Sequence, residues 1–113
     1  LVNGLIATRP RPGEDTNAKT AFESAYAAAG GADGAIYTGE TYDAIKIIAA
    51  SIISDPENIL TSLKKTGTNY VGASGTHTFD ANGDVAGTGY EVCQFDGTAF
   101  SCPRTWTSDD GIK

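Results

Sequence analysis

The segment from Tyr37 to Tyr42, with the sequence YTGETY, holds the side chains best suited to bind a small polar molecule. It places two phenols, two hydroxyls and the carboxylate of Glu40 at the start of an expected helix. A tyrosine combines apolar area with a hydrogen-bonding tip, and a carboxylate can pair with an ammonium group, so the cluster suits a zwitterionic solute. A ligand-free interpretation places Glu40 or Thr41 at the helix terminus and Tyr42 in the core. The residues alone favour this second interpretation.

Catalytic chemistry finds little support in the sequence. His77 is the only histidine, and we expect it to be a partly exposed strand residue rather than a general base. Ser74 lacks the G-x-S-x-G frame of a nucleophile elbow, and the glycines form no G-x-G-x-x-G loop between a strand and a helix. We therefore expect no catalytic residue, no enzymatic activity and no cofactor.

A calcium-loop pattern is matched at its first, third, fifth and twelfth positions by Asp80, Asn82, Asp84 and Glu91. The sixth position of that loop needs glycine for a sharp bend, but this chain has Val85 there and no flanking helices are expected. The Asn82-Gly83 pair is itself a strong turn signal, because it supplies positive φ angles. We therefore predict a turn and no metal site.

The two cysteines, Cys93 and Cys102, flank a segment that reads as a hairpin tip. If Gly97-Thr98 forms a two-residue type II′ turn, Phe95 faces Phe100 and the cysteines face each other in a non-hydrogen-bonded pair. Their Cα atoms would then approach to roughly 4.5 Å, within reach of a disulfide. The alternative is two free buried thiols, and zinc would require two further ligands. A disulfide implies an oxidising compartment, such as the periplasm or the extracellular face of the membrane.

Helical periodicity places three helices in the first two-thirds of the chain. The first begins at Asp15 or Thr16 and runs to about Ala29, with one buried apolar stripe. The second, about Thr41 to Ile53, is apolar almost all round and must be covered on most sides. The third has Asp55 as its cap and Pro56 at its first helical position, and runs to about Thr66.

The remaining segments read as strands and connectors. Leu1–Thr8, with its β-prone part at Leu5–Thr8, is an expected strand, Arg9–Gly13 a connector, and Ala35–Tyr37 a short extended piece. From Asn69 onward the alternation predicts β-structure, and Thr107–Gly111 reads as a frayed tail.

Length and composition limit the functional classes. The 113 residues suffice for one small domain or a piece of a larger one. The net charge is −6 and the eight basic residues are scattered, which argues against a nucleic-acid partner. No apolar run reaches about eighteen residues, so no segment is expected to span a membrane. The sequence opens without a visible export signal, and we expect the chain to be incomplete.

Several segments follow one another in the order seen in a known family. These segments are an opening strand, an "F...Y" helix, a "YDA" helix, a glycine-punctuated strand ending in FDANGD, and the closing segment: Gly4–Thr8, Phe22 and Tyr26, Tyr42–Ala44, Gly72–Asp84, and Tyr90–Phe100. In this order they resemble the last third of a branched-chain amino acid (Leu/Ile/Val-type) binding protein, a type I periplasmic solute-binding protein of an ABC transporter.

The resemblance implies an α/β fold that is part of two lobes joined by crossovers, with helices followed by β-hairpins. Residues 1–14 would supply a strand and crossover of the second lobe, residues 15–86 the helical and strand segment of the first lobe, and residues 87–113 a hairpin of the second lobe. In that family the tyrosine of the "YDA" segment lies near the cleft. Tyr42 is therefore the first ligand candidate, and Glu40 the second.

The implied function is extracytoplasmic capture of a small polar solute, an amino acid or related compound, for an ABC-type importer. The implied partners are the solute, the membrane permease, and the missing N-terminal part of the same protein or a second copy. The family's main amino-acid clamp lies in the absent two-thirds, so this segment alone should not form a complete cleft. The alternative is a non-catalytic module that self-associates through the apolar second helix.

Overall fold

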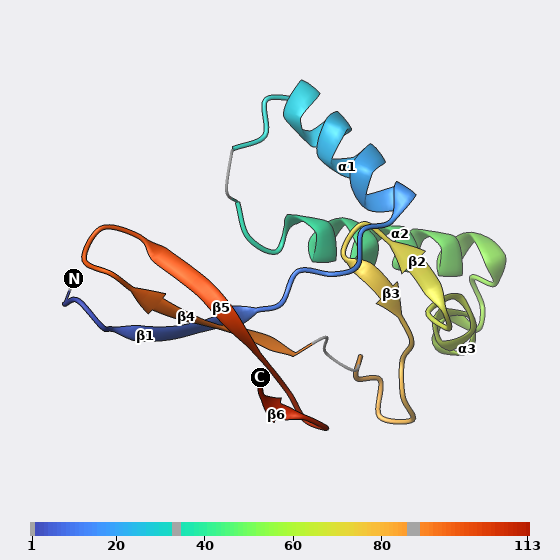
Figure 1. The fold of residues 1–113 in the computed structure, drawn as a ribbon. Coiled ribbons are helices and arrows are strands. Elements are labelled where there is room, and N and C mark those ends of the chain that lie inside the picture. Colours follow the sequence, from blue (N-terminus) through green and yellow to red (C-terminus); the bar gives the residue numbers. More distant parts are fainter. Residues whose placement is uncertain (1, 33–34, 86–88) are drawn as a thin grey trace. The chain divides into compact units, whose positions relative to one another are not determined.

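Three helices and six strands make up the described part of the computed structural model, which covers residues 2–32, 35–85 and 89–113 (Figure 1). The elements in chain order are β1 (Ile6–Pro10), α1 (Asn17–Ala28), α2 (Thr38–Ser54), α3 (Ile59–Thr66), β2 (Tyr70–Gly72), β3 (Gly75–His77), β4 (Tyr90–Phe95), β5 (Phe100–Thr107) and β6 (Gly111–Ile112). The expected α/β class, with helices followed by β-hairpins, is confirmed.

The chain divides into two compact units. Unit 1 consists of Leu1–Pro12 and Gly87–Lys113, and unit 2 consists of Gly13–Ala86. The second boundary lies among residues 86–88, outside the described residues. The assignment of these segments to two lobes remains a prediction.

Unit 1 is built on a four-stranded antiparallel sheet with the order β1-β4-β5-β6. Strand β1 pairs with β4 from Ile6 opposite Gln94 to Pro10 opposite Tyr90. The expectation that Arg9 and Pro10 belong to a connector was therefore wrong. Because β1 is an edge strand, Pro10 can lack its amide hydrogen without breaking the interior of the sheet.

The β4–β5 hairpin has the register that the sequence predicts at its tip. Phe95 lies opposite Phe100, with ring centroids 5.2 Å apart. Beyond the strands, the amide of Asp96 donates to the carbonyl of Ala99 at 3.0 Å, and Gly97 has a φ of 100°. Further from the tip the register shifts between Val92 and Gln94, a β-bulge that strengthens the local twist.

The end of the chain is a strand rather than a frayed tail. Trp106 lies opposite Ile112 in β6. The backbones of Thr105 and Lys113 exchange hydrogen bonds of 3.0 and 2.8 Å. A strand of two residues is too short to show period-two alternation, which explains why the sequence did not reveal it.

In unit 2, α1 is capped and tethered by one residue. The Thr16 hydroxyl oxygen accepts from the Lys19 amide at 3.0 Å, and the same hydroxyl donates to the carbonyl of Gly72 at 2.9 Å. The cap matches the sequence prediction. The expected buried stripe was wrong, since α1 has no buried residue and even Phe22 and Tyr26 are only half-buried. Within the described chain, too little structure packs over this helix to cover the stripe.

Helix α2 begins three residues before the expected Thr41 and ends at Ser54. Its buried residues, Asp43, Ile47 and Ser51, recur every four positions and mark one face. The Ser51 hydroxyl donates to the Ile47 carbonyl at 2.7 Å, which satisfies it inside the helix. The rest of the helix is as apolar as predicted yet largely uncovered in the described structure, with four exposed isoleucines: Ile45, Ile48, Ile52 and Ile53.

Helix α3 begins at Ile59, three residues later than the expected first helical residue, Pro56, and its cap is Asn58 rather than Asp55. The carboxylate of Asp55 accepts from the amide of Asn58 at 3.1 Å, so it closes a bend rather than capping the helix directly. Lys64 and Lys65 lie in the last turn and Gly67 follows the helix, as the sequence predicts.

Strands β2 and β3 form a two-stranded antiparallel sheet, with Val71 opposite Thr76. Downstream, the predicted turn at Asn82-Gly83 is present: Asp80 Oδ1 accepts from the amides of Asn82 and Asp84 at 2.8 and 2.9 Å. The Asp80 carboxylate is therefore part of the turn, as predicted when the turn was preferred to a calcium loop. The expected extended piece at 35–37 is wrong, since Ile36 and Tyr37 form a bend before α2 and Tyr37 has a left-handed backbone.

No helix in the described residues is both long enough and apolar enough to cross a membrane.

Candidate functional site

The most heavily hydrogen-bonded side chain in unit 2 is the buried carboxylate of Asp43. Asp43 Oδ1 accepts from the amide of Ala73, and Oδ2 accepts from both the amide and the hydroxyl of Ser74, all at 2.7 Å. Burial acts to raise the pKa of Asp43, but the hydrogen bonds from Ser74, Ala73 and His77 outweigh it and lower the pKa. Asp43 therefore fixes the β2–β3 turn against α2 as an ionised carboxylate.

His77, at the end of β3, completes this cluster. Its Nε2 lies 2.8 Å from Ser74 Oγ and 3.3 Å from Asp43 Oδ2. The single hydroxyl hydrogen of Ser74 is donated to Asp43, so the consistent tautomer of His77 carries its hydrogen on Nε2 and donates it.

The three residue types are those of a hydrolase triad, but their arrangement is different. In a triad the carboxylate binds Nδ1, while Nε2 accepts the serine proton. Here one nitrogen, Nε2, contacts both partners. The cluster therefore holds structure together rather than activating Ser74. Sequence reasoning placed His77 on a strand, as observed, but missed the cluster, because its members are brought together only by the tertiary fold.

Tyr42, the first predicted ligand residue, is part of α2, and its ring packs against α1. Its ring centroid is 4.9 Å from that of Phe22, which in turn stacks on Tyr26 at 5.6 Å. The Tyr42 side chain is nevertheless 41% exposed. The residue thus contributes to packing and remains accessible, while its role in ligand binding stays a prediction.

Tyr42 also lines a pocket of about 250 Å³ within unit 2. The walls include three alanines of α1 and three aromatic rings: Ala18, Ala21, Ala25, Phe22, Tyr42 and Tyr70. Glu40 is exposed in the first turn of α2 and is not part of this lining. Two positions along a helix correspond to a rotation of about 200°, so Glu40 and Tyr42 project from opposite sides. The structure does not bring these two candidates together.

Tyr37 has an unusual backbone that the sequence did not reveal. It precedes α2 with a φ of 60°, in the left-handed region that bulky residues rarely adopt. The Thr41 hydroxyl donates to the Tyr37 carbonyl at 2.8 Å, and the Tyr37 side chain is exposed. Such backbone outliers cluster at ligand sites. Tyr37 therefore joins the candidates.

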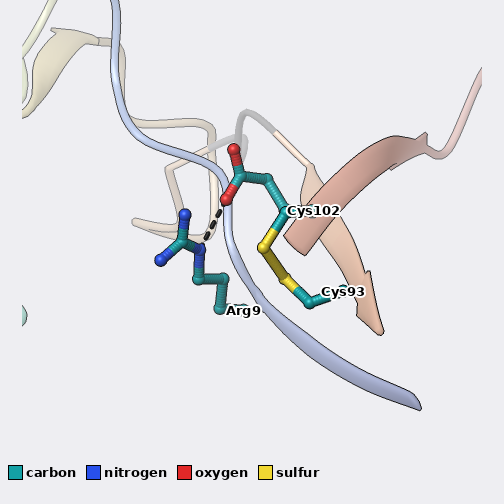
Figure 2. Close-up of a disulfide and its surroundings, with 4 residues drawn as sticks. Arg9, Cys93 and Cys102 are labelled. Atoms are coloured by element: carbon teal, nitrogen blue, oxygen red, sulfur yellow. Dashed lines mark hydrogen bonds and ion pairs between the residues drawn. A yellow bond between two sulfur atoms is a disulfide. The ribbon is translucent and has the colours of Figure 1, made fainter. Parts of the chain in front are cut away.

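In unit 1, the predicted disulfide is present. Cys93 and Cys102 are joined by an S–S bond of 2.07 Å, with their Cα atoms 3.9 Å apart. Figure 2 shows the disulfide beside Arg9, whose Nε donates to the carboxylate of Glu91. A carboxylate oxygen of Glu91 and the two sulfurs lie within 4.8 Å of one another. They make no metal site in this state, because each sulfur is already bonded to the other.

Comparison with solved structures explains the arrangement of the elements. A leucine-binding protein, LivK from Thermotoga maritima, superimposes on 96% of this chain with a TM-score of 0.71 and 24% sequence identity. The chain has the fold of part of a type I periplasmic binding protein. No protein-family model matches the sequence. A search of curated proteins also finds no match.

The match covers 32% of the LivK chain, so the present chain spans about a third of that protein's length. Its periplasmic-binding-protein fold accounts for features that are unusual in a self-contained domain. The helices come first and the antiparallel strands follow, and α2 presents isoleucines that the described residues leave exposed.

Proposed function

We propose that this chain is a segment of an extracytoplasmic solute-binding protein that captures an amino acid or a related small polar compound for an ABC-type importer. The observation that carries the proposal is the fold match to a leucine-binding protein over 96% of the chain. On this proposal the chain acts by binding and not by catalysis. Its partners are the solute and the membrane permease, together with the remaining part of the binding protein.

The disulfide supports the extracytoplasmic location. Structural disulfides persist in oxidising compartments and are rare in the cytosol. Cys93 is buried, so it is a structural residue rather than a reactive surface thiol. The location we propose is the periplasm or the extracellular face of the membrane.

The predicted solute contacts are Tyr42 and Glu40, to which the backbone of Tyr37 adds a third candidate. Tyr42 supplies a phenol on a ring already held by Phe22, and Glu40 supplies an exposed carboxylate near the positive end of the α2 dipole. A phenol and a carboxylate can accept hydrogen bonds from an ammonium group. The two need not share one pocket, because solutes of two-lobed proteins are enclosed only when the lobes close.

The test is isothermal titration of the protein with a panel of L-amino acids, after native mass spectrometry has shown whether a longer polypeptide accompanies the 113-residue chain. Tyr42→Phe keeps the ring on Phe22 and removes only the hydroxyl, and Glu40→Gln removes only the charge. The matched controls are Tyr26→Phe, whose ring also stacks on Phe22, and Glu23→Gln on exposed α1. We expect the affinity to fall about tenfold in each test variant and to remain unchanged in the controls. Absence of amino-acid binding by a sample that contains the longer polypeptide would refute the proposed amino-acid capture, whereas the 113 residues alone are not expected to form a complete cleft.

A second candidate function is favoured by the exposed isoleucines of α2. Ile45, Ile48 and Ile52 recur at three- and four-residue spacing and are 61%, 47% and 45% exposed. Such an exposed apolar stripe favours self-association. Light scattering of wild type and of Ile45→Lys with Ile52→Lys separates the two functions. A dimer that the substitutions dissociate, without any amino-acid affinity, supports a self-associating module.

A further inference from the structure

Three side chains that can each bind a metal ion converge on the β4–β5 hairpin. Glu91 and Cys93 belong to β4, and Cys102 belongs to β5. A carboxylate oxygen of Glu91 and the two sulfurs lie within 4.8 Å of one another. In the part of the chain that the structure describes, no other three histidine, cysteine or acidic side chains bring their ligand atoms this close together.

Strand pairing fixes Glu91 beside the sulfurs. Arg9 of β1 lies directly opposite Glu91, and its Nε donates to Glu91 Oε2 (Figure 2). The Glu91 side chain is 18% exposed, whereas that of Arg9 is 63% exposed. A carboxylate has two oxygens and about four acceptor positions, so the contact with Arg9 leaves Glu91 able to bind a metal ion. Arg9 thus orients the carboxylate, as hydrogen-bond partners commonly orient the ligands of a metal.

The two sulfurs become ligands when the disulfide is reduced. A dithiol transfers its two hydrogens to Cys93 and Cys102, and its own sulfurs then join in a disulfide. Each protein thiol releases its proton when it binds a metal ion. In a tetrahedral zinc site with Zn–S bonds of about 2.3 Å, two sulfurs lie about 3.8 Å apart, compared with 2.07 Å in the disulfide. The strands hold the two Cα atoms 3.9 Å apart, so rotation about the Cα–Cβ bonds is enough to reach this separation.

The surroundings leave space for an ion and a water molecule. Arg9, Glu91, Cys93 and Cys102 all line one cavity of about 490 Å³. Cys102 is only partly buried, so a reductant and an ion can reach its sulfur. Thiolates are soft ligands that select zinc over magnesium or calcium, and zinc also accepts a carboxylate. The fold thus adds Glu91 to the two cysteines, and three protein ligands with one water is a set that zinc adopts.

We propose that the reduced β4–β5 hairpin binds one Zn²⁺ through Cys93, Cys102 and Glu91, with water in the fourth position. Formation of the disulfide removes both sulfur ligands and releases the ion. The hairpin is then closed by a metal ion in the reduced state and by a covalent bond in the oxidised state. All three ligands belong to unit 1, so metal binding does not require solute capture.

The test is a Zn²⁺ titration of the protein as isolated, oxidised and reduced, against a chromophoric chelator. A phosphine serves as reductant, because a dithiol would itself bind zinc. The phosphine takes oxygen from water and becomes its oxide, and a thiol assay shows that both cysteines are reduced. We expect one Zn²⁺ per reduced chain, and Co²⁺ in its place should give thiolate-to-cobalt charge-transfer absorption. A Cys93→Ala, Cys102→Ala variant should lose both signals. No binding by the reduced wild type, or equal binding by the oxidised protein, would overturn the proposal.

Substitutions of Glu91 separate a three-ligand site from a simple pair of thiols. Glu91→Gln should lower the Zn²⁺ affinity at least about tenfold, because even the loss of a group that orients a ligand costs about 10- to 100-fold. Glu91→His supplies another zinc ligand and should regain most of the affinity. Asp110→Asn is the matched control, since it removes another carboxylate of unit 1 from an ion pair, here with Lys113, and should leave the affinity unchanged. Equal Zn²⁺ affinity in wild type and Glu91→Gln would contradict the assignment of Glu91 as a ligand.

Discussion

Asp43 and Ser74, separated by 31 residues, are joined by two hydrogen bonds to one oxygen: Asp43 Oδ2 accepts the amide and the hydroxyl of Ser74, each at 2.7 Å. This pair connects α2 to the β2–β3 turn. These hydrogen bonds explain why a carboxylate, Asp43, lies on the buried face of α2 beside Ile47 and Ser51. A fully buried Asp43 is tolerated because each oxygen has a donor.

Replacing Asp43 with asparagine should destabilise unit 2. An amide group has one oxygen where the carboxylate has two, so at least one of the Ala73 and Ser74 amides loses its acceptor. We expect the free energy of unfolding to fall by about 2–4 kcal/mol, measured by urea denaturation with far-UV circular dichroism. Asp84→Asn on the exposed turn is the matched control. Equal losses in the two variants would refute a special role for Asp43.

The same carboxylate should make stability depend on pH. Burial opposes the ionised form of Asp43, but the hydrogen bonds from Ser74, Ala73 and His77 prevail and lower its pKa below the ordinary 3.8. The stabilisation by Asp43 is therefore fully present above the unfolded-state pKa and is lost as pH falls through the lower folded-state pKa. Other carboxylates with lowered pKa values, including Asp80 and Asp96, also contribute to the loss of wild-type stability at acidic pH.

The contribution of Asp43 is isolated by comparing wild type with Asp43→Asn across pH 2 to 7. We expect the stability difference between them to be largest above about pH 4 and to shrink on acidification. Thermal denaturation at each pH measures it. A difference that stays constant down to pH 2 would show that the ionised carboxylate is not the stabilising form.

Local signals in the sequence were sufficient for the elements that local interactions determine. Thr16 caps α1 because its own hydroxyl accepts from Lys19, three residues away. Gly97 sets the tip of the β4–β5 hairpin, and the register there follows from counting outward. The disulfide was predictable for the same reason.

Other features were not predictable. The start of α3 was misplaced because the Asp55 carboxylate binds the Asn58 amide, a local choice that the Asp-Pro pattern does not reveal. The Asp43 cluster arises only when α2 meets the β2–β3 turn, and no residue pattern signals the left-handed backbone of Tyr37. Tyr42 is accessible and lines a pocket. Glu40 lies two positions away and projects from another side of the helix, because two positions correspond to a rotation of about 200°. Solute binding by either residue stays a prediction.

Gly72 should be intolerant of any side chain. A Cβ at this position would overlap the carboxylate of Asp43, which is fixed by its hydrogen bonds and cannot move aside. Gly72→Ala should therefore lower the free energy of unfolding by about 1–3 kcal/mol. Gly39→Ala is the control, since its Cβ would lie 3.4 Å from the Ser74 side chain and alanine favours helix α2. We expect Gly39→Ala to be neutral or stabilising in the same urea titration, and similar losses in both variants would contradict the steric argument.

Reducing the disulfide should weaken unit 1 while leaving unit 2 intact. Cys93 and Cys102 are nine residues apart, and closing a loop of that size is worth about 2–3 kcal/mol of unfolded-state entropy. Trp106 is the only tryptophan and lies on β5 with its ring 6.0 Å from that of Tyr90, so its fluorescence reports on unit 1. With reductant, the unfolding transition seen by Trp106 fluorescence should move to lower urea concentration. The transition of unit 2, followed by helical circular dichroism, should stay where it was.

In a Cys93→Ala, Cys102→Ala variant, the reductant should change nothing. If reductant shifts the fluorescence of this variant as much as that of wild type, the effect does not come from the disulfide.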